Sequence, residues 1–258
     1  MDYSDLTLEK DGTVAFLTLN RPTKRNSLSL NLMEEVIRAL AEVAHDHSTG
    51  AVVIRGAGPA FCAGHDLSEM RGRDLPTYRK IFDTCTQMMN AIQALPQPVI
   101  AQVHGIATAA GCQLVATCDL AVAEEGAKFA TPGVKIGLFC STPMVPLSRA
   151  VGRKKALEML LTGDYLDAHE ARAVGLINKI VSAAALAEET AALARKIASA
   201  SPLVLGLGKQ AFYAQMDLPQ AQAYSYAKEI MSLNAMAEDA QEGMSAFLEK
   251  RTPQWKGR

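Results

Sequence analysis

Two turns rich in glycine and alanine are the segments of this sequence best suited to chemistry. The first, Phe61–Leu67, follows a strand-like segment, and the second, Gly105–Leu114, lies between a predicted strand and a predicted helix. Small residues at a helix start let a ligand approach backbone N–H groups that have no partner in the first helical turn. Two such donors from separate turns could converge on one developing oxyanion. Either turn alone is more typical of tight packing.

Other catalytic and ligand-binding patterns are missing or weak. The sequence has no G-x-S-x-G elbow, no phosphate-binding P-loop and no H-E-x-x-H motif. Gly56-Ala57-Gly58 follows a strand but lacks the third glycine of a dinucleotide-binding fingerprint. No histidine pair has metal-ligand spacing; the histidines are His45, His47, His65, His104 and His169. We therefore expect no metal and no cofactor.

The elements that position these turns predict an α/β fold. Asp11-Gly12 between two alternating segments, Leu6–Lys10 and Val14–Asn20, indicates a hairpin. Apolar runs predict further strands at 51–55, 99–103, 120–123 and 128–130. Helical spacing predicts helices after a Ser29 cap and at 75–94, 153–161, 185–199, 202–215, 218–236 and 238–250. Strands in the first half that alternate with helices favour crossover connections.

Composition narrows the class of protein and its surroundings. The chain has 258 residues, of which 49% are hydrophobic and 21% charged, as in ordinary globular proteins. A net charge of −1 provides no basic surface for nucleic acid. No apolar run approaches the roughly 18 residues of a membrane span. Five cysteines without paired spacing and no recognisable targeting segment predict a cytoplasmic location.

Seven ordered segments resemble the crotonase (enoyl-CoA hydratase/isomerase) superfamily along the whole chain. Within the superfamily, the chain is most similar to the enoyl-CoA hydratase domain-containing protein 3 group. This similarity is clearest at Cys112–Ala116, and at Thr131–Val134 with the following Gly137–Pro143. The seven segments are Leu19–Asn26, Phe61–Leu67, Ala109–Asp119, Phe129–Gly137, Arg149–Gly152, Ala168–Leu176 and Glu242–Arg251.

This resemblance implies a fold and an assembly. The expected fold is a crotonase-like spiral of ββα turns over residues 1–200, with a helical C-terminal trimerisation region at 201–258 in the same domain. The expected partners are an acyl-CoA ligand and copies of the chain itself, in a homotrimer or a hexamer built as a dimer of trimers. Neither nucleic acid nor a membrane is expected as a partner.

The resemblance also assigns site residues. The backbone amides of His65 and Ala110 would form an oxyanion hole for the carbonyl of a CoA thioester. The remaining expected substrate-binding residues are Lys24 and Arg25 beside the CoA phosphates, Ala63, Asp66, Leu67 and Ser68 along the first turn, Cys140 in the acyl pocket, and Phe247 and Lys250 reaching a neighbouring subunit. The other reading of Lys24, Arg25 and Lys250 is solvated surface charge.

The sequence departs from the hydratases at their two catalytic glutamates. Those positions are Gln113 and Gly133 here. A glutamine cannot exchange a proton at neutral pH, and a glycine has no side chain to do so. Because such groups contribute about 10²–10⁴-fold each, we do not expect efficient hydration. His65 is the one side chain at the predicted site that could titrate near neutrality, and some decarboxylases of the superfamily resemble this turn. Their active-site tyrosine is replaced by Cys140.

Two hypotheses stay open from sequence. The first is an enzyme of fatty-acid metabolism, an acyl-CoA lyase, isomerase or decarboxylase that uses the oxyanion hole without the glutamate pair. The second is a catalytically silent protein that binds acyl-CoA or regulates its metabolism. Restoring both glutamates, by Gln113→Glu with Gly133→Glu, is expected to recover hydration if the scaffold is intact.

Overall fold

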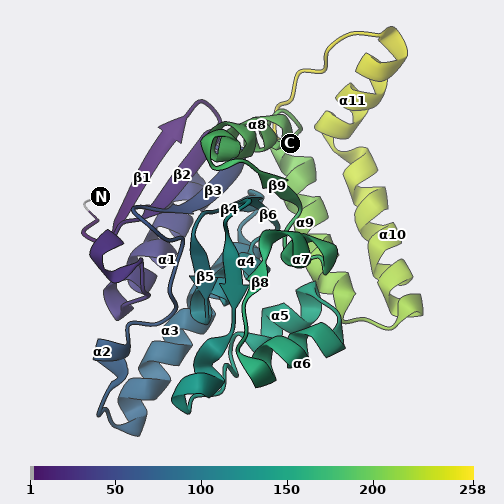
Figure 1. The fold of residues 1–258 in the computed structure, drawn as a ribbon. Helices are drawn as coiled ribbons and strands as arrows, with labels where there is room; N and C mark the ends of the chain where they lie inside the picture. Colours follow the sequence, from purple (N-terminus) through teal and green to yellow (C-terminus); the bar gives the residue numbers. More distant parts are fainter. Residues whose placement is uncertain (1–2) are drawn as a thin grey trace.

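The predicted hairpin forms the edge of a six-stranded sheet. In this computed structural model, which describes residues 3–258, β1 (Leu6–Asp11) pairs antiparallel with β2 (Val14–Leu19) (Figure 1). The next strands are β3 (Ala51–Gly56), β4 (Val99–Val103), β6 (Leu120–Glu124) and β9 (Lys179–Val181), in that spatial order and all parallel. Parallel neighbours require crossover connections, so the α/β prediction is confirmed.

Helices provide those crossovers. The connection from β2 to β3 contains α1 (Leu30–His45), which the Ser29 hydroxyl caps by accepting from the Leu32 N–H. The connection from β3 to β4 contains α2 (Leu67–Met70) and α3 (Leu75–Ala94). Between β4 and β6 lie β5 (Ile106–Thr108) and α4 (Ala110–Thr117), which carry the second glycine-rich turn.

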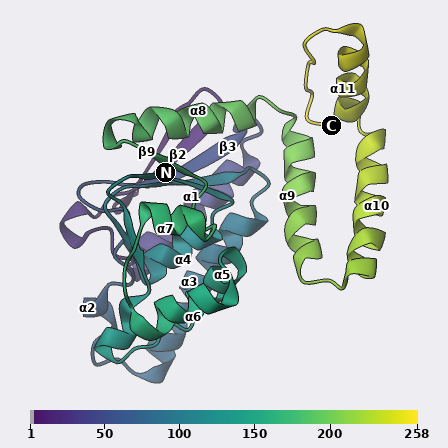
Figure 2. The same cartoon turned by 45° about the vertical axis from the view of Figure 1, so that its right-hand side comes forward.

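Alternate residues of the strands face two different layers. Phe16 and Val53 pack with Ala191 of α8 (Leu186–Ala198), which covers one face of the sheet (Figure 2). Leu17 and Ile54 point to the opposite face, into the main core with α1 and α3. This period of two is the geometry of a strand buried on both sides, and it makes the sheet a rigid platform for the loops at its ends.

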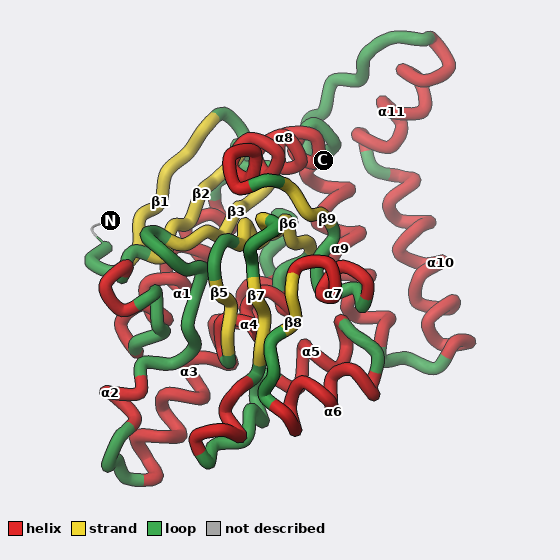
Figure 3. The backbone as a smooth tube through the Cα atoms, in the orientation of Figure 1, coloured by secondary structure: helices red, strands yellow, loops and turns green. Residues whose placement is uncertain are grey.

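A second, smaller sheet is formed by one short strand before β6 and two short strands after it. Its order is β5-β7-β8, with β7 at Lys128–Ala130 and β8 at Leu166–Asp167 (Figure 3). The remaining elements are α5 (Met144–Ala150), α6 (Arg153–Thr162), α7 (Ala168–Ala173) and the short 3-10 helices at Pro22–Lys24, Pro132–Ile136 and Ala183–Ala185. Sequence analysis missed β5, β8, β9, α2, α5 and α7, because segments of two to seven residues are too short to show a period.

Three helices follow α8 at the C-terminal end of the chain. They are α9 (Pro202–Met216), α10 (Gln220–Met236) and α11 (Glu238–Glu249), close to the predicted bounds. Figure 2 shows α10 antiparallel to α9 and farther from the sheets. Large apolar side chains on this helical region stand in solvent in the single chain, including Met236 and Phe247 at 81% and 84% exposure. No helix within residues 3–258 is long and apolar enough to cross a bilayer.

A buried ionic cluster fastens α9 to the sheet. Lys209 Nζ lies 2.7 Å from Asp119 Oδ2 and donates to the Ile92 and Gln97 carbonyls. The Tyr213 hydroxyl donates to Asp119 Oδ1 at 2.7 Å. Burial lowers the pKa of Lys209, and the Asp119 carboxylate opposes that shift. Asp119 therefore has a structural role, since it pairs with Lys209 and accepts a hydrogen bond from Tyr213.

We predict that Asp119→Ala lowers the free energy of unfolding by about 3 kcal/mol, because it leaves the Lys209 ammonium buried without a counter-charge. Adding Lys209→Met to that variant should recover about 1 kcal/mol or more, since it removes the orphaned charge. Urea unfolding of both variants measures the difference. A single substitution that costs less than about 1 kcal/mol would contradict this role for the cluster.

Candidate active site

The first glycine-rich turn is fixed by backbone pairing with the segment before α1. The Leu28 N–H donates to the Gly64 carbonyl at 2.7 Å, and the Asp66 N–H donates to the Leu28 carbonyl at 3.0 Å. In such a parallel bridge the residue between the two bonds, His65, turns its own N–H to the opposite side. No acceptor for the His65 N–H is found among residues 3–258. The turn therefore presents one unpaired donor.

The other edge of the same turn pairs with β5. The Cys62 N–H donates to the Ile106 carbonyl at 3.1 Å, and the Thr108 N–H donates to the Cys62 carbonyl at 3.0 Å. Two residues later the chain enters α4. The start of α4 lies against this turn, because a Cβ at Gly111 would stand 2.1 Å from the Cys62 carbonyl oxygen. Only glycine permits that approach.

Ala110 provides the second unpaired donor. It is the first residue of α4, where an N–H has no partner within the helix. A Cβ built on Gly64 would lie 3.4 Å from the Ala110 nitrogen, so the peptide before His65 is in contact with the helix start. The structure thus brings the first turn, which carries the His65 amide, into contact with the start of α4, which carries the Ala110 amide. These are the two amides that the resemblance assigned to the site.

The residue before this donor has an unusual backbone. Ala109 has φ 51° and ψ −117°, a conformation that L-residues rarely adopt and that costs about 1–3 kcal/mol. Nothing in the sequence marks this position, because a conformation of this kind is normally signalled by glycine. The Ala109 N–H donates to the Ala130 carbonyl, and this bond, together with the packing of α4, keeps the residue in its strained conformation. Its effect is to aim the Ala110 N–H.

Both amides border a largely apolar cavity of about 600 Å³. Of the residues predicted from sequence, those that line it are Ala63, His65, Asp66, Leu67, Ala110, Gly133 and Cys140. Lining residues that sequence analysis did not identify include Met70, Phe82, Leu138 and Phe139. These come from α2, α3 and the loop after the 3-10 helix at Pro132–Ile136, and no motif marks these four side chains as cavity residues. Within residues 3–258 no cluster of three or more His, Cys, Asp or Glu side chains could hold a metal ion.

The other predicted binding residues lie outside the cavity. Lys24 and Arg25 are exposed beside the first turn, where the Arg25 carbonyl accepts the Ala63 N–H. Ser68 is exposed and donates its hydroxyl to Asp66. Phe247 and Lys250 lie at the end of α11, far from α2 in both Figure 1 and Figure 2. Within one chain they do not contribute to this cavity.

Gln113 is turned away from the cavity. Its side chain is buried, at 4% exposure, and its Oε1 lies 4.0 Å from Cys85 Sγ on α3. It does not line the space next to the two donors. The amide that replaces the first hydratase glutamate is thus packed into the interface between α3 and α4.

Gly133 has no room for any side chain. A Cβ there would lie 2.0 Å from the Leu138 carbonyl oxygen and 2.8 Å from Cys140 Sγ. The loop is closed by the Leu138 N–H, which donates to the Gly133 carbonyl at 2.9 Å. The expectation that Gly133→Glu would restore an acid–base group is therefore wrong for this backbone, because the place of that side chain is filled by the chain itself.

The His65 ring was expected from sequence to titrate near neutrality, and the structure contradicts this expectation. The ring packs against Phe82 with 5.5 Å between centroids, and both ring nitrogens are buried without a hydrogen-bond partner among residues 3–258. Burial lowers its pKa to about 4, so the ring is neutral at pH 7 and does not titrate near neutrality. Burial also raises the pKa of the Cys140 thiol, which keeps it protonated. Neither side chain is an activated proton-transfer group or nucleophile.

Comparisons with known proteins agree with this architecture. The model of the enoyl-CoA hydratase/isomerase family matches residues 9–258. The chain is 48% identical to the mitochondrial enoyl-CoA hydratase domain-containing protein 3 of Danio rerio, over 98% of this chain and 89% of that protein. A crystal structure of enoyl-CoA hydratase from Mycobacterium smegmatis matches with a TM-score of 0.95 and 50% identity, covering 98% of this chain and 99% of the other. Human enoyl-CoA hydratase domain-containing protein 3 matches with a TM-score of 0.95 and 45% identity, covering 98% and 100%.

These similarities confirm two predictions and overturn one. The crotonase fold and the likeness to the domain-containing protein 3 group are confirmed. The expected cytoplasmic location is contradicted, because the Danio rerio and human relatives are both named as mitochondrial proteins. The five reduced cysteines on which that expectation relied are all buried here, and buried thiols are compatible with more than one compartment.

The depressed pKa of His65 predicts a pH-dependent stability. Because the unfolded ring takes up a proton near pH 6.5 and the folded ring only near pH 4, acidification favours unfolding across that window. The contribution of His65 at pH 5.0 should be about 2 kcal/mol less favourable than at pH 7.5. Urea unfolding of the unmodified protein and of His65→Phe at both pH values isolates the contribution of His65 to the pH dependence of stability. An equal pH dependence in both proteins would show that the ring is not buried as described.

The closed loop at Gly133 predicts that even a methyl group is not tolerated. Gly133→Ala should lower the free energy of unfolding by about 2 kcal/mol or more, since the new Cβ meets backbone atoms. Gly208→Ala on exposed α9, where a Cβ meets nothing within 4 Å, is the matched control and should be neutral or stabilising by up to about 1 kcal/mol. Thermal and urea unfolding give both values. A Gly133→Ala protein as stable as the control would mean that this loop is open.

Proposed function

Because the chain belongs to the enoyl-CoA hydratase/isomerase family, we propose that it binds acyl-CoA thioesters and polarises their carbonyl, without performing efficient hydration. The thioester oxygen would accept hydrogen bonds from the His65 and Ala110 amides. The acyl group would occupy the apolar cavity beyond them. With such a ligand the protein would act in fatty-acid or acyl-CoA metabolism.

The observation that carries this proposal is the pair of unpaired N–H groups on His65 and Ala110, two residues that line the same apolar cavity. A polarised thioester carbonyl makes the neighbouring Cα proton acidic, because the resulting enolate oxygen receives both hydrogen bonds. One such donor contributes roughly 10²–10³-fold to the rate. The N-terminus of α4 adds a favourable dipole at the same point.

The chemistry available after carbonyl polarisation is limited by the few carboxylates near the two donors. Asp66 is the one carboxylate that lines the cavity within the described residues. Its burial would raise its pKa, but hydrogen bonds from Ser68 and Arg21 lower the pKa below its ordinary value. A carboxylate held in this way is a weak base. The favoured reaction is decarboxylation, because loss of carbon dioxide generates the enolate without removal of a Cα proton. Exchange and isomerisation at Cα require that proton to be removed and would be slow with a weak base.

A second candidate is a catalytically silent acyl-CoA-binding or regulatory protein. The neutral His65 ring and the engaged Asp66 carboxylate favour it, because neither is prepared to move a proton. Both candidates share the same ligand and the same carbonyl contacts. They differ only in whether the bound thioester changes.

We also propose that the CoA phosphates lie near exposed Lys24 and Arg25, and that the protein assembles as a homotrimer or a dimer of trimers. The apolar side chains left in solvent on α10 and α11 support an assembly, since a stable monomer rarely exposes so many. In that assembly Phe247 and Lys250 would approach a ligand held by a neighbouring subunit.

The test is mass spectrometry of acyl-CoA, enoyl-CoA and malonyl-type thioesters incubated with the protein in heavy water. We expect deuterium at Cα or loss of carbon dioxide from some thioester, and no efficient gain of water by an enoyl thioester. Thioesters that bind and return unchanged would select the silent candidate. Efficient hydration, or no binding of any thioester, would contradict the proposal.

A matched pair of variants tests the Ala110 donor. Proline is tolerated at the first position of a helix and removes its N–H. In an Ala109→Gly background, which relaxes the strained residue before it, Ala110→Pro should reduce any Cα exchange by about 100-fold or more. Ala109→Gly alone, with both donors present, should stay within about 10-fold of the unmodified protein. Equal rates in the two variants would remove Ala110 from the site.

A further inference from the structure

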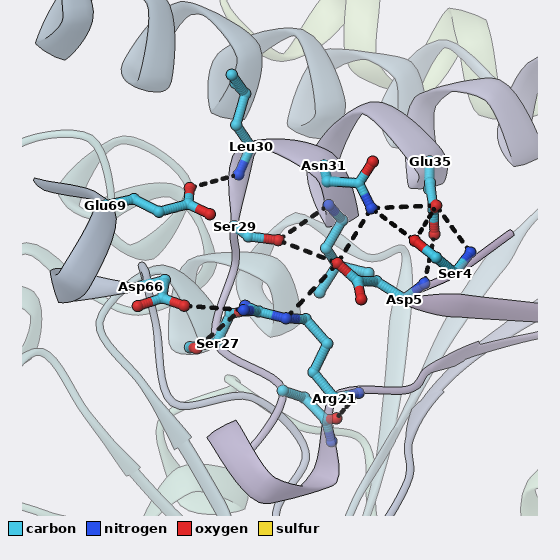
Figure 4. A network of polar contacts seen from close by, with 12 residues as sticks. Ser4, Asp5, Arg21, Ser27, Ser29, Leu30, Asn31, Glu35, Asp66 and Glu69 are labelled. Carbon is cyan, nitrogen blue, oxygen red and sulfur yellow. Dashed lines mark hydrogen bonds and ion pairs between the residues drawn. The ribbon is translucent and has the colours of Figure 1, made fainter.

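A polar network behind the first glycine-rich turn contains an arginine that sequence analysis left without a role (Figure 4). We propose that Arg21 is the positioning residue of the His65 donor: its guanidinium clamps together the two chain segments whose pairing aims the His65 N–H. This inference rests on the proposed function, because it concerns the same carbonyl-binding site. Arg21 does not line the cavity, so any effect must pass through the residues that it holds.

The clamp spans both segments. Arg21 Nη2 donates to Asp66 Oδ2 at 2.9 Å, and Arg21 Nη1 donates to the Ser27 carbonyl at 2.6 Å. Ser27 immediately precedes Leu28, and Asp66 immediately follows His65. These contacts therefore flank the Leu28–His65 bridge on its two strands. A displacement of either strand would stretch one of the two contacts.

Both the backbone and the guanidinium of Arg21 have further partners. The Arg21 backbone N–H donates to Asn26 Oδ1 at 2.9 Å, and the fully buried Asn26 side chain donates to the Ala57 and Ala60 carbonyls. Asp5 Oδ2 lies 3.6 Å from Arg21 Nε. Figure 4 shows this carboxylate between Arg21 and Asn31. The arginine side chain, at 16% exposure, is thus fixed between the N-terminal strand and the turn.

Asp66 transmits the constraint. One carboxylate oxygen receives Arg21, while the other accepts from the Ser68 N–H at 3.1 Å and the Ser68 hydroxyl at 2.6 Å and so caps α2. His65, whose N–H is the proposed donor, is therefore followed directly by Asp66, whose two carboxylate oxygens are both hydrogen-bonded. A misplacement of about 1 Å in such a site can cost about 100-fold in rate.

A planar, forked donor is needed for this geometry. The two Arg21 nitrogens bond a carboxylate and a carbonyl on different strands at once, whereas a lysine ammonium is a point charge with a shorter reach. Arg21→Lys keeps the charge next to Asp66 and limits the loss of stability. It should nevertheless release one strand of the clamp.

The test uses infrared spectra of a thioester labelled with ¹³C at its carbonyl, because this readout requires binding but no turnover. In the unmodified protein the carbonyl band should shift to lower frequency on binding, as expected for a carbonyl that accepts two hydrogen bonds. In Arg21→Lys we expect about half of that shift or less, with any Cα exchange slowed about 10–100-fold and the KM changed less than about 3-fold. A merely structural role for Arg21 would lower stability without moving the band.

The control is Arg55→Ala, which removes an arginine paired with Glu9 and packed on Phe16, away from the site. Millimolar guanidinium should restore the band shift of Arg21→Ala and leave Arg55→Ala unaffected. No band shift in the unmodified protein would overturn the proposed function itself. A full shift in folded Arg21→Lys, or no rescue of Arg21→Ala, would overturn the role of Arg21 alone.

Discussion

The site depends on how one short stretch of backbone is paired on both of its edges. Residues 61–66 bond to β5 on one side and to the segment before α1 on the other. This double pairing satisfies almost every polar group of a buried turn, as buried backbone requires. The His65 N–H has no acceptor among the described residues, and the alternation of the parallel bridge turns it away from Leu28. The strained Ala109 directly precedes the second donor, the Ala110 N–H. The two unpaired donors thus have two origins, the alternation of the bridge at His65 and the start of α4 at Ala110.

The same close packing limits what the site can do. The loop after Thr131 folds onto Gly133 so tightly that a carbonyl and a thiol occupy the space of a side chain. Gln113 is packed against α3, and Asp66 is committed to Arg21 and α2. The site therefore presents two backbone donors, and Asp66 is the one carboxylate beside them among the described residues. Both candidate functions are compatible with two donors and an engaged carboxylate. They differ in whether the bound thioester reacts without the help of an acid–base side chain.

Sequence reasoning identified the long, periodic elements and the two turns that carry the donors, because their signals are local. The hairpin at Asp11-Gly12, the Ser29-capped helix and α3 agree with the prediction. The short strands β5, β8 and β9 carry too few residues for a period. The roles of Arg21, Ala109 and Gly133 arise from contacts between segments far apart in the chain. The neutral His65 ring follows from burial against Phe82, which no spacing reveals.

In the proposed complex the backbone amides of His65 and Ala110 bind the thioester carbonyl. The most direct test is calorimetric comparison of an acyl-CoA with its thioether analogue, which has the same chain and CoA but no carbonyl oxygen. Two added hydrogen bonds of about 1 kcal/mol each predict that the thioester binds roughly 10-fold tighter or more. Equal affinity for the two ligands would contradict the account, because the unpaired amides would then have no part in binding.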